Sequence, residues 1–201
     1  MRYQTPERAD QVEKLAQAAY DAGDSADPAV RLGRAGCVLL LAYCGLRWDE
    51  MARRVCDVDF LRRRVSVERN VVGDGGRLKW MTPKNHEART VPLPRDLVDE
   101  LAAGAEGLAA DDLLFPSPCG DGNSNRNACR QWWDRTVVAA GAPGGMTPHE
   151  LRHTAASLAV SAGANMKAVQ RMLGHKSAAM RLDVYADLFD DELVWVRAAG
   201  G

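Results

Sequence analysis

Hydrophobic positions recur with a helical period along most of the chain. The most apolar stretch, residues 29–43, predicts a buried helix that ends at Gly45. A Thr-Pro-Glu start at residues 5–7 predicts an earlier capped helix that ends near residue 22. Spacings of three and four residues predict further helices at 48–55, 94–103, 125–140, 147–161 and 166–173, and a last one through Tyr185.

Between these helices one region alternates with the period of a β-strand. Residues 64–72 alternate with β-branched side chains, and the GDGG sequence at 73–76 is a strong signal for a hairpin turn. Two more strands are predicted at 78–82 and 89–93. We therefore expect a mixed, mainly α fold with a small three-stranded antiparallel β-sheet, in a single domain over residues 1–201.

Charge is distributed unevenly, although the chain as a whole carries a formal charge of only -1. Residues 31–95 contain 14 basic and 7 acidic side chains, and residues 121–182 contain 8 basic and 3 acidic ones. These two blocks could form one face that binds a polyanion, or they could be solvated helix faces. Charge alone does not decide between the two interpretations.

Composition excludes several classes of protein. Hydrophobic residues make up 46% of the chain and charged residues 26%, as in ordinary globular proteins. No apolar run approaches the length of a membrane span, and the first residues lack the apolar core of a signal peptide. The 5 cysteines form no Cys-x-x-Cys pair, so we expect reduced thiols in a cytoplasmic protein, without zinc or disulfides.

The segment TPHELRHT at 147–154 predicts an unusual helix start. Thr147 can cap the helix, Pro148 suits its first position, and Glu150 completes a capping box. His149 then lies in the first turn, where unpaired N–H groups and the helix dipole favour an anion and a neutral imidazole. Arg152 follows about 60° around the helix axis.

One face of this predicted helix is apolar, with Leu151 and Leu158 in its core stripe. Arg152 lies on the opposite side with Ala156, whose small side chain would let another group approach. His153 lies about 40° from that side and is either a bystander or a structural hydrogen-bonding group. Two histidines four residues apart can bind a metal, but a cation lies between them and no acidic ligand is near, which argues against a metal.

Three other stretches carry candidate residues, each with a plain structural alternative. Arg47 has Glu50 three residues later, which fits a phosphate-binding arginine or an ordinary ion pair. Lys84 is expected in a hairpin between two strands, as a reactive ammonium or an exposed turn residue. His175 directly follows a helix-ending glycine, and Tyr185 fits either a nucleophile or a core position.

Together these stretches resemble the catalytic domain of the tyrosine recombinases, the phage integrase family, over about residues 31–189. The family pattern is Arg-x-x-Glu, a hairpin lysine, His-x-x-Arg, Leu-Gly-His and a tyrosine, in that order. One departure is the Met-Arg pair at 180–181, where many members have a threonine. The resemblance implies the tyrosine recombinase catalytic-domain fold and DNA strand cleavage and rejoining through a 3′-phosphotyrosine.

The resemblance also implies a role for each matching residue. Two arginines would bind the nonbridging phosphate oxygens, a histidine would accept the proton of the tyrosine, and the lysine would protonate the departing 5′ oxygen. A second histidine would hydrogen-bond the phosphate, and neither a metal nor another cofactor is required. The implied catalytic residues are Arg47, Lys84, His149, Arg152, His175 and Tyr185, with Glu50 supporting Arg47.

The implied partners are DNA attachment sites, three further protomers in a homo-tetramer, and accessory DNA-bending or directionality proteins, in the cytoplasm of a bacterial cell and away from membranes. We expect a catalytic fragment that lacks the N-terminal DNA-binding domains of the family. The tail at about 187–201 would pack on a neighbouring protomer or on its own domain. Three alternatives stay open: a non-catalytic helix-turn-helix-like DNA-binding module at 147–173, topoisomerase-type relaxation of DNA, and an inactive relative that only binds.

Overall fold

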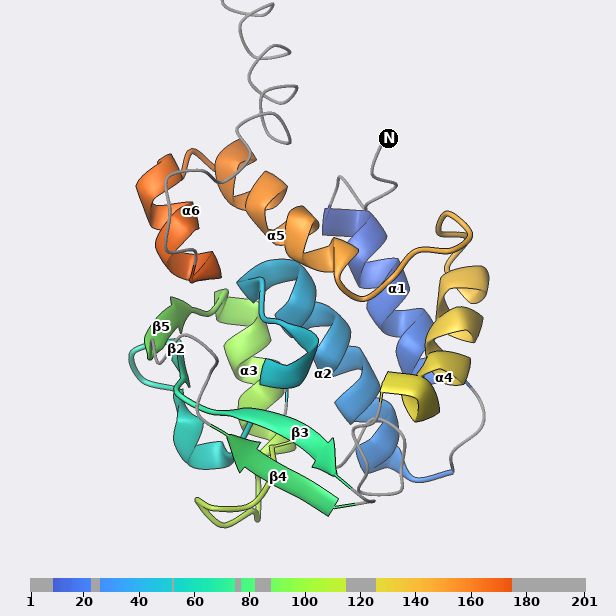
Figure 1. Cartoon of the computed structure of the whole chain (residues 1–201), viewed down its shortest axis with the longest axis horizontal. Coiled ribbons are helices and arrows are strands. Elements are labelled where there is room, and N and C mark those ends of the chain that lie inside the picture. Colours follow the sequence, from blue (N-terminus) through green and yellow to red (C-terminus); the bar gives the residue numbers. More distant parts are fainter. Residues whose placement is uncertain are drawn as a thin grey trace, which may run out of the picture.

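A single helix, α2 (Pro28–Cys44), lies at the centre of the molecule, with the other elements arranged around it (Figure 1). The computed structural model describes residues 9–22, 26–51, 53–74, 77–81, 88–114 and 126–174. Asp27 caps the start of α2 through its side chain, and Gly45 ends the helix in the left-handed conformation, with φ 61°. The buried helix predicted from the apolar stretch is confirmed.

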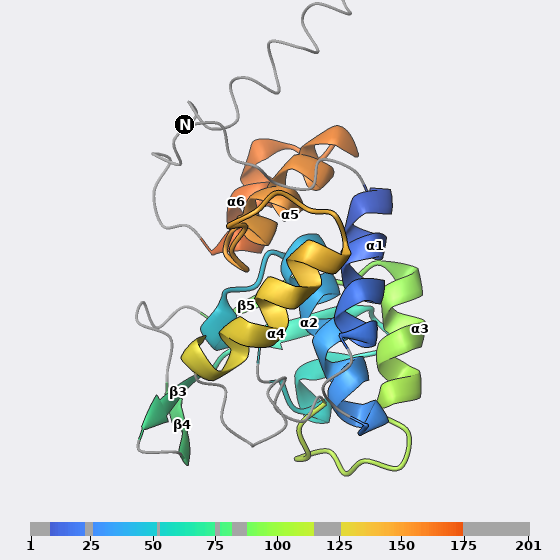
Figure 2. The same ribbon diagram turned by 90° about the vertical axis from the view of Figure 1, so that its right-hand side faces the viewer.

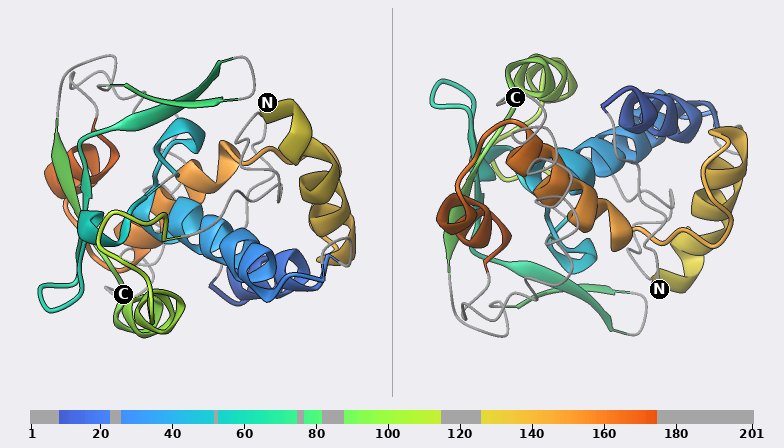
Figure 3. Two further views of the ribbon diagram at one scale, coloured as in Figure 1. Left: turned by 90° about the horizontal axis from the view of Figure 1, so that it is seen from below. Right: turned by 90° about the horizontal axis from the view of Figure 1, so that it is seen from above.

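Within the described ranges five more α-helices surround α2, and Figures 2 and 3 show them from other sides. The ends predicted for most of them agree with the structure to within about two residues. The predicted start of the first helix and the predicted last helix lie outside the described residues. The surrounding helices are α1 (Ala9–Asp21), α3 (Arg95–Gly104), α4 (Arg126–Ala139), α5 (Glu150–Ser161) and α6 (Met166–Leu173).

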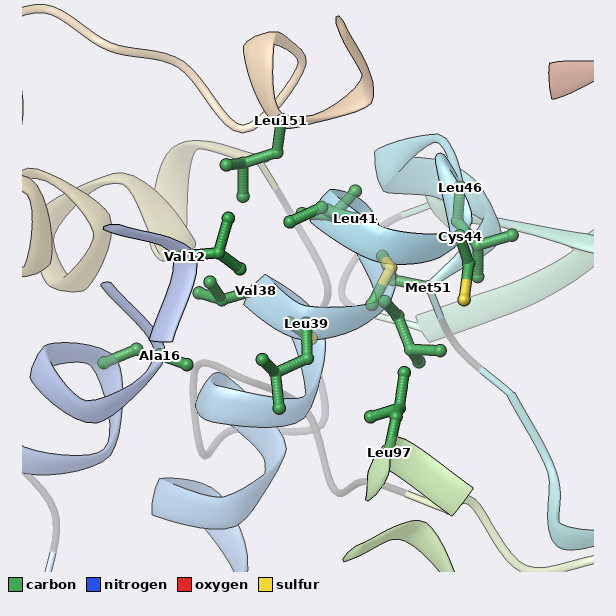
Figure 4. Packing of buried hydrophobic residues seen from close by; sticks show 14 of the residues in the cluster. Val12, Ala16, Val38, Leu39, Leu41, Cys44, Leu46, Met51, Leu97 and Leu151 are labelled. Carbon is green, nitrogen blue, oxygen red and sulfur yellow. The ribbon is translucent and has the colours of Figure 1, made fainter. Parts of the chain in front are cut away.

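The main core forms where three of these helices meet α2. Figure 4 shows Val12 of α1, Leu97 of α3 and Leu151 of α5 converging on α2 from different sides. Each fully buried side chain of this kind contributes roughly 1.5–3 kcal/mol. A second, smaller cluster lies between α5 and α6 and consists of Ala156, Val160, Val169 and Leu173.

The sheet has the predicted size and direction but different members. β1 (Val58–Asp59), β2 (Arg64–Val67) and β5 (Arg89–Pro92) form a three-stranded antiparallel sheet, whereas β3 (Asn70–Asp74) and β4 (Arg77–Met81) form a separate hairpin. The prediction of one continuous strand over 64–72 is therefore wrong. The strand is interrupted after residue 67, where the carbonyl of Arg69 binds the buried Arg53 guanidinium instead of a strand partner.

The short α-helix predicted at 48–55 is also not formed. Two 3₁₀ turns, η1 (Trp48–Glu50) and η2 (Val55–Asp57), replace it. The carboxylates of Glu50 and Asp57 accept hydrogen bonds from main-chain N–H groups three residues earlier, and this interaction favours an isolated turn. Between the turns, Arg54 forms an extended bridge to Leu113, which interrupts helical continuation.

The described residues bear on two predictions, the absence of a membrane span and the presence of reduced cysteines. No helix in those ranges has both the length and the apolar character needed to cross a bilayer. Cys37 and Cys44 are buried free thiols, and burial raises the pKa of each to about 12. Cys56 is an exposed free thiol, and the side chains of the other two cysteines lie outside the described part.

Gly45 makes a testable contribution to stability, because a side chain there would meet other helices. A Cβ atom at Gly45 would lie 2.5 Å from Leu173 Cδ2, whereas Gly107, with φ 79°, has nothing within 4 Å of such an atom. We expect Gly107→Ala to cost about 1–2 kcal/mol for its backbone conformation alone. Gly45→Ala should cost a further ~1–3 kcal/mol from overpacking, measured by urea unfolding. Equal losses for the two variants would contradict this account of the α2–α6 contact.

Candidate active site

Arg47 lies on the turn that follows α2, at one edge of the site. Its backbone is extended, with φ -82° and ψ 160°, and its side chain is 36% exposed. The Glu50 side chain, 1% exposed, accepts hydrogen bonds from the Arg47 main-chain N–H at 2.7 Å and from Arg47 Nη1 at 3.4 Å. The predicted pairing of Arg47 with Glu50 is therefore present as a contact.

A second arginine, Arg89 of β5, holds Glu50 more closely than Arg47 does. Its Nη1 and Nη2 donate to the two carboxylate oxygens at 2.7 and 2.6 Å, and its Nε donates to the carbonyl of Met172 at 2.9 Å. Burial opposes ionisation of the Glu50 carboxyl, but the bonds and charge of Arg89, with a smaller contribution from Arg47, hold its pKa below the ordinary value. The sequence pattern places Arg89 in a strand and does not reveal this pairing.

Arg152 of α5 is a buried charge at the ends of two helices. Its Nη1 donates to the carbonyl of Gly45, at the end of α2, and its Nη2 donates to the carbonyl of Leu173, the last residue of α6. Carbonyls at helix C-termini carry partial negative charge, so a guanidinium there is favoured electrostatically. Arg152 thus holds the end of α6 close to the turn that carries Arg47.

The side of α5 that was predicted to be open is covered. Ala156 and Val160 are buried, and they pack against Val169 and Leu173 of α6. The group that approaches small Ala156 is α6. Thus α5 is buried on two sides, by α2 on one and by α6 on the other.

His149 lies just before the regular helix, on the surface. The helix begins at Glu150, two residues after the predicted first position at Pro148, and His149 takes the N-cap position. The Glu150 carboxylate accepts a hydrogen bond from the Thr147 main-chain N–H, so the carboxylate half of the predicted capping box is present. The ring of His149 contacts that of His153 edge to face, with 5.7 Å between centroids.

The structure brings only part of the predicted set together. Arg152 binds the carbonyl that lies two residues before Arg47, and Glu50 closes the same turn. Lys84, His175 and Tyr185 lie outside the described residues, as does the tail at 187–201. α6 ends at Gly174 in the left-handed conformation, with φ 65°, immediately before His175 in the sequence. Among the described residues, no cluster of three His, Cys, Asp or Glu side chains could hold a metal ion.

The basic block at 31–95 is only partly a surface feature. Arg34 and Arg53 are buried, and Arg89 is occupied by Glu50. Outside this interior group, the guanidiniums of Arg54 and Arg69 lie over the ring of Trp80, at 4.8 and 5.4 Å from its centroid. Counting charges along the sequence therefore overestimates the charge that this block presents to a polyanion. Its exposed arginines near the β1–β2 connection are Arg62 and Arg63 in the turn and Arg64 at the start of β2.

The family of this chain follows from a match over most of its length. The profile described as "Phage integrase family" matches residues 8–192, most of the chain. The chain belongs to the phage integrase family. The arginines at 47 and 152 therefore lie in a domain of integrase type.

Relatives of this integrase domain include tyrosine recombinases and a putative prophage integrase. Tyrosine recombinase XerC of Corynebacterium efficiens is 32% identical over 159 residues, which cover 76% of this chain and 46% of the relative. A putative prophage phiRv2 integrase of Mycobacterium tuberculosis is 31% identical and covers 72% of this chain and 40% of the relative. The integrase domain thus spans about half the length of the curated relatives that it matches.

Solved structures show the same fold at lower sequence identity. The Tn1549 transposon integrase in complex with a circular intermediate DNA matches with a TM-score of 0.72 and 20% identity, over 92% of this chain and 62% of that one. The XerA recombinase matches with a TM-score of 0.63 and 23% identity, over 89% and 58%. The predicted tyrosine recombinase catalytic-domain fold is confirmed.

His153 of α5 gives this integrase domain a testable pH dependence. Burial, followed by the positive charges of His149 and Arg152, lowers the pKa of His153 from 6.5, although Glu150 opposes the shift. The unfolded state therefore binds more protons than the folded state below about pH 6.5, so this histidine stabilises the fold above that pH and the stabilisation is lost as pH falls.

We expect the free energy of unfolding to decrease between about pH 7.5 and 5.5, and His153→Gln to reduce that decrease. Urea unfolding across the pH range measures both. If the slope with pH is the same in wild type and in His153→Gln, His153 is not the group that titrates.

Proposed function

We propose that this chain is the catalytic domain of a site-specific DNA recombinase or integrase, which cleaves and rejoins DNA through a 3′-phosphotyrosine. The observation that carries the proposal is the hydrogen-bonded unit in which Arg152 binds the carbonyl of Gly45, two residues before Arg47. One guanidinium carried by this turn and a second one bonded to it from α5 suit an anion with two nonbridging oxygens. Membership of the integrase family supplies the chemistry that such a pair would serve.

The two arginines would act on the phosphate. A phosphodiester is an anion, and negative charge on its nonbridging oxygens increases as a nucleophile attacks the phosphorus. Arg47 is partly exposed and Arg152 is buried, so we assign the outer contact to Arg47 and the inner one to Arg152. Their orientation before the reaction is what makes such donors effective in the transition state.

Tyr185 would carry out the covalent step. Its oxygen attacks the phosphorus, the bond from phosphorus to the 5′ oxygen breaks, and the 3′ phosphate becomes joined to the tyrosine. His149 accepts the phenolic proton, Lys84 donates a proton to the departing 5′ oxygen, and His175 donates a hydrogen bond to the phosphate. Attack by a 5′ hydroxyl of another strand reverses these steps, so the DNA backbone is restored without an external energy source.

DNA attachment sites are the proposed substrates. Support comes from the matching Tn1549 integrase, whose structure contains circular intermediate DNA, and from XerH, which was solved with a palindromic difH substrate after cleavage. We further propose that four protomers act together on two duplexes in a bacterial cytoplasm, with accessory proteins that bend DNA or set direction. The tail after Tyr185 is the proposed contact between protomers.

Covalent trapping tests the proposal. The full chain is incubated with a pool of nicked suicide duplexes that have a randomised central site, and the bound sequences are enriched and tested singly. We expect a covalent protein–DNA band in denaturing gels that persists in EDTA and is absent in Tyr185→Phe, because that variant lacks the attacking oxygen.

The other outcomes point to other functions. A duplex that is bound specifically without ever giving the band would favour a non-catalytic DNA-binding module or an inactive relative. Relaxation of supercoiled plasmid without exchange between duplexes would favour a topoisomerase-type activity.

Arg47 provides a second test, because its partly exposed side chain can be changed with little effect on the core. We expect Arg47→Gln to lower the single-turnover cleavage rate by roughly 10²–10³-fold, as for the loss of one oriented donor. Arg31→Gln is the control, since Arg31 forms an ion pair with Asp21 at the distant end of α2. A rate for Arg47→Gln within twofold of the control would remove Arg47 from the proposed site.

A further inference from the structure

We propose that Arg89 is a positioning residue that couples the Arg47 turn to the C-terminal end of α6, so that one guanidinium sets both parts of the site. The inference rests on the proposed function. Arg89 has a 10% exposed side chain and makes three hydrogen bonds: two to Glu50, and one to the carbonyl of Met172. The strand that carries it, β5, belongs to the three-stranded sheet, so the guanidinium joins three separate elements.

The first connection runs through Glu50 to Arg47. Glu50 binds Arg89 through both oxygens at 2.6 and 2.7 Å, whereas its contact with Arg47 Nη1 is longer, at 3.4 Å. Glu50 also accepts the main-chain N–H of Arg47 at 2.7 Å, and this bond determines where the Arg47 backbone lies. Movement of the Glu50 carboxylate would therefore move Arg47, the proposed phosphate-binding residue. Arg89 prevents that movement.

The second connection runs to the residues that precede His175 in the sequence. Arg89 Nε binds the carbonyl of Met172, and Arg152 binds the next carbonyl, at Leu173. Gly174 lies against the Arg89 side chain, since a Cβ atom at Gly174 would be only 3.0 Å from Arg89 Cδ. The end of α6 is thus held by two arginines, one of which also controls the Arg47 turn.

Only an arginine can make this set of contacts. Its planar fork presents two parallel N–H groups to a carboxylate, while the Nε–H donates in another direction. A lysine keeps the charge but presents one compact ammonium, which cannot span both carboxylate oxygens and also reach Met172. Comparison of Arg89→Lys with Arg89→Gln therefore separates geometry from charge.

Amide hydrogen exchange on the full chain tests the coupling independently of any activity. The reporters are the N–H of Met51, bonded to the carbonyl of Trp48, and the N–H of Gly174, bonded to the carbonyl of Arg171. We expect both amides to exchange faster in Arg89→Lys and in Arg89→Gln, because both connections are lost. Faster exchange at only one of the two reporters, or at neither, would overturn the coupling.

A matched control is present at the other end of α2. Arg31 also binds one carbonyl and one carboxylate, those of Tyr20 at 2.8 Å and of Asp21 at 3.1 Å. Arg31→Gln should leave both reporter amides unchanged. If Arg89→Gln does not fold in urea titrations, Arg89→Lys carries the comparison.

Cleavage of the enriched nicked duplex tests the consequence for the reaction. We expect Arg89→Lys to lower the single-turnover rate at saturating DNA by about 10²-fold, the loss typical of a catalytic group displaced by about 1 Å, while the Kd for DNA stays within twofold. A wild-type rate in Arg89→Lys would show that charge alone suffices and would overturn the proposal.

A double-mutant cycle with Arg47→Gln identifies the route of the effect. If Arg89 acts partly through Arg47, the combined loss in rate is smaller than the product of the two single losses. A fully multiplicative loss would overturn the connection to Arg47. Absence of any covalent product with the wild-type chain would instead contradict the proposed function, and the exchange measurements would still decide whether the coupling exists.

Discussion

The arrangement of this site depends on one buried negative charge, the carboxylate of Glu50. A buried carboxylate is unfavourable unless cationic donors surround it, and here two guanidiniums and a main-chain N–H do so. The donors come from the turn after α2 and from β5, and Arg89 extends the contact to α6. The interactions that satisfy this charge therefore also determine how three elements lie relative to one another.

Helix ends supply the second constraint. Arg152 binds the terminal carbonyls of α2 and α6, so a positive charge lies where two helix dipoles are negative. Arg47, Arg89 and Arg152 outnumber Glu50, which makes these four side chains together cationic. A cationic group that is already fixed by the fold can receive an anion without reorganising, the condition for effective electrostatic stabilisation of a transition state.

Local signals in the sequence predict the helices well and the site in part. α2 and α6 were located because each combines an apolar period with a glycine stop, and Arg47 with Glu50 was found because the pair lies within one turn. The size and direction of the sheet were predicted but its member strands were not, since the pairing of Val65 with Val91 joins distant segments. A signal for Arg89 existed: it lies two residues before buried Val91 in one strand, so it shares the inward face and needs a carboxylate. Which carboxylate it binds depends on the tertiary fold, because Glu50 lies 39 residues earlier in the sequence.

The hydrogen bond from Arg152 to the Gly45 carbonyl requires α2 to have a fixed length. Each residue added to or removed from an α-helix turns its end by about 100° and shifts it by about 1.5 Å. Such a change within α2 would move this carbonyl away from Arg152. It would also move the Arg47 turn, with Glu50, away from Arg89. Insertions in surface loops have no comparable effect on the site. Variation in length among proteins with this arrangement should therefore collect in loops and avoid α2, whichever DNA sequence each protein recognises.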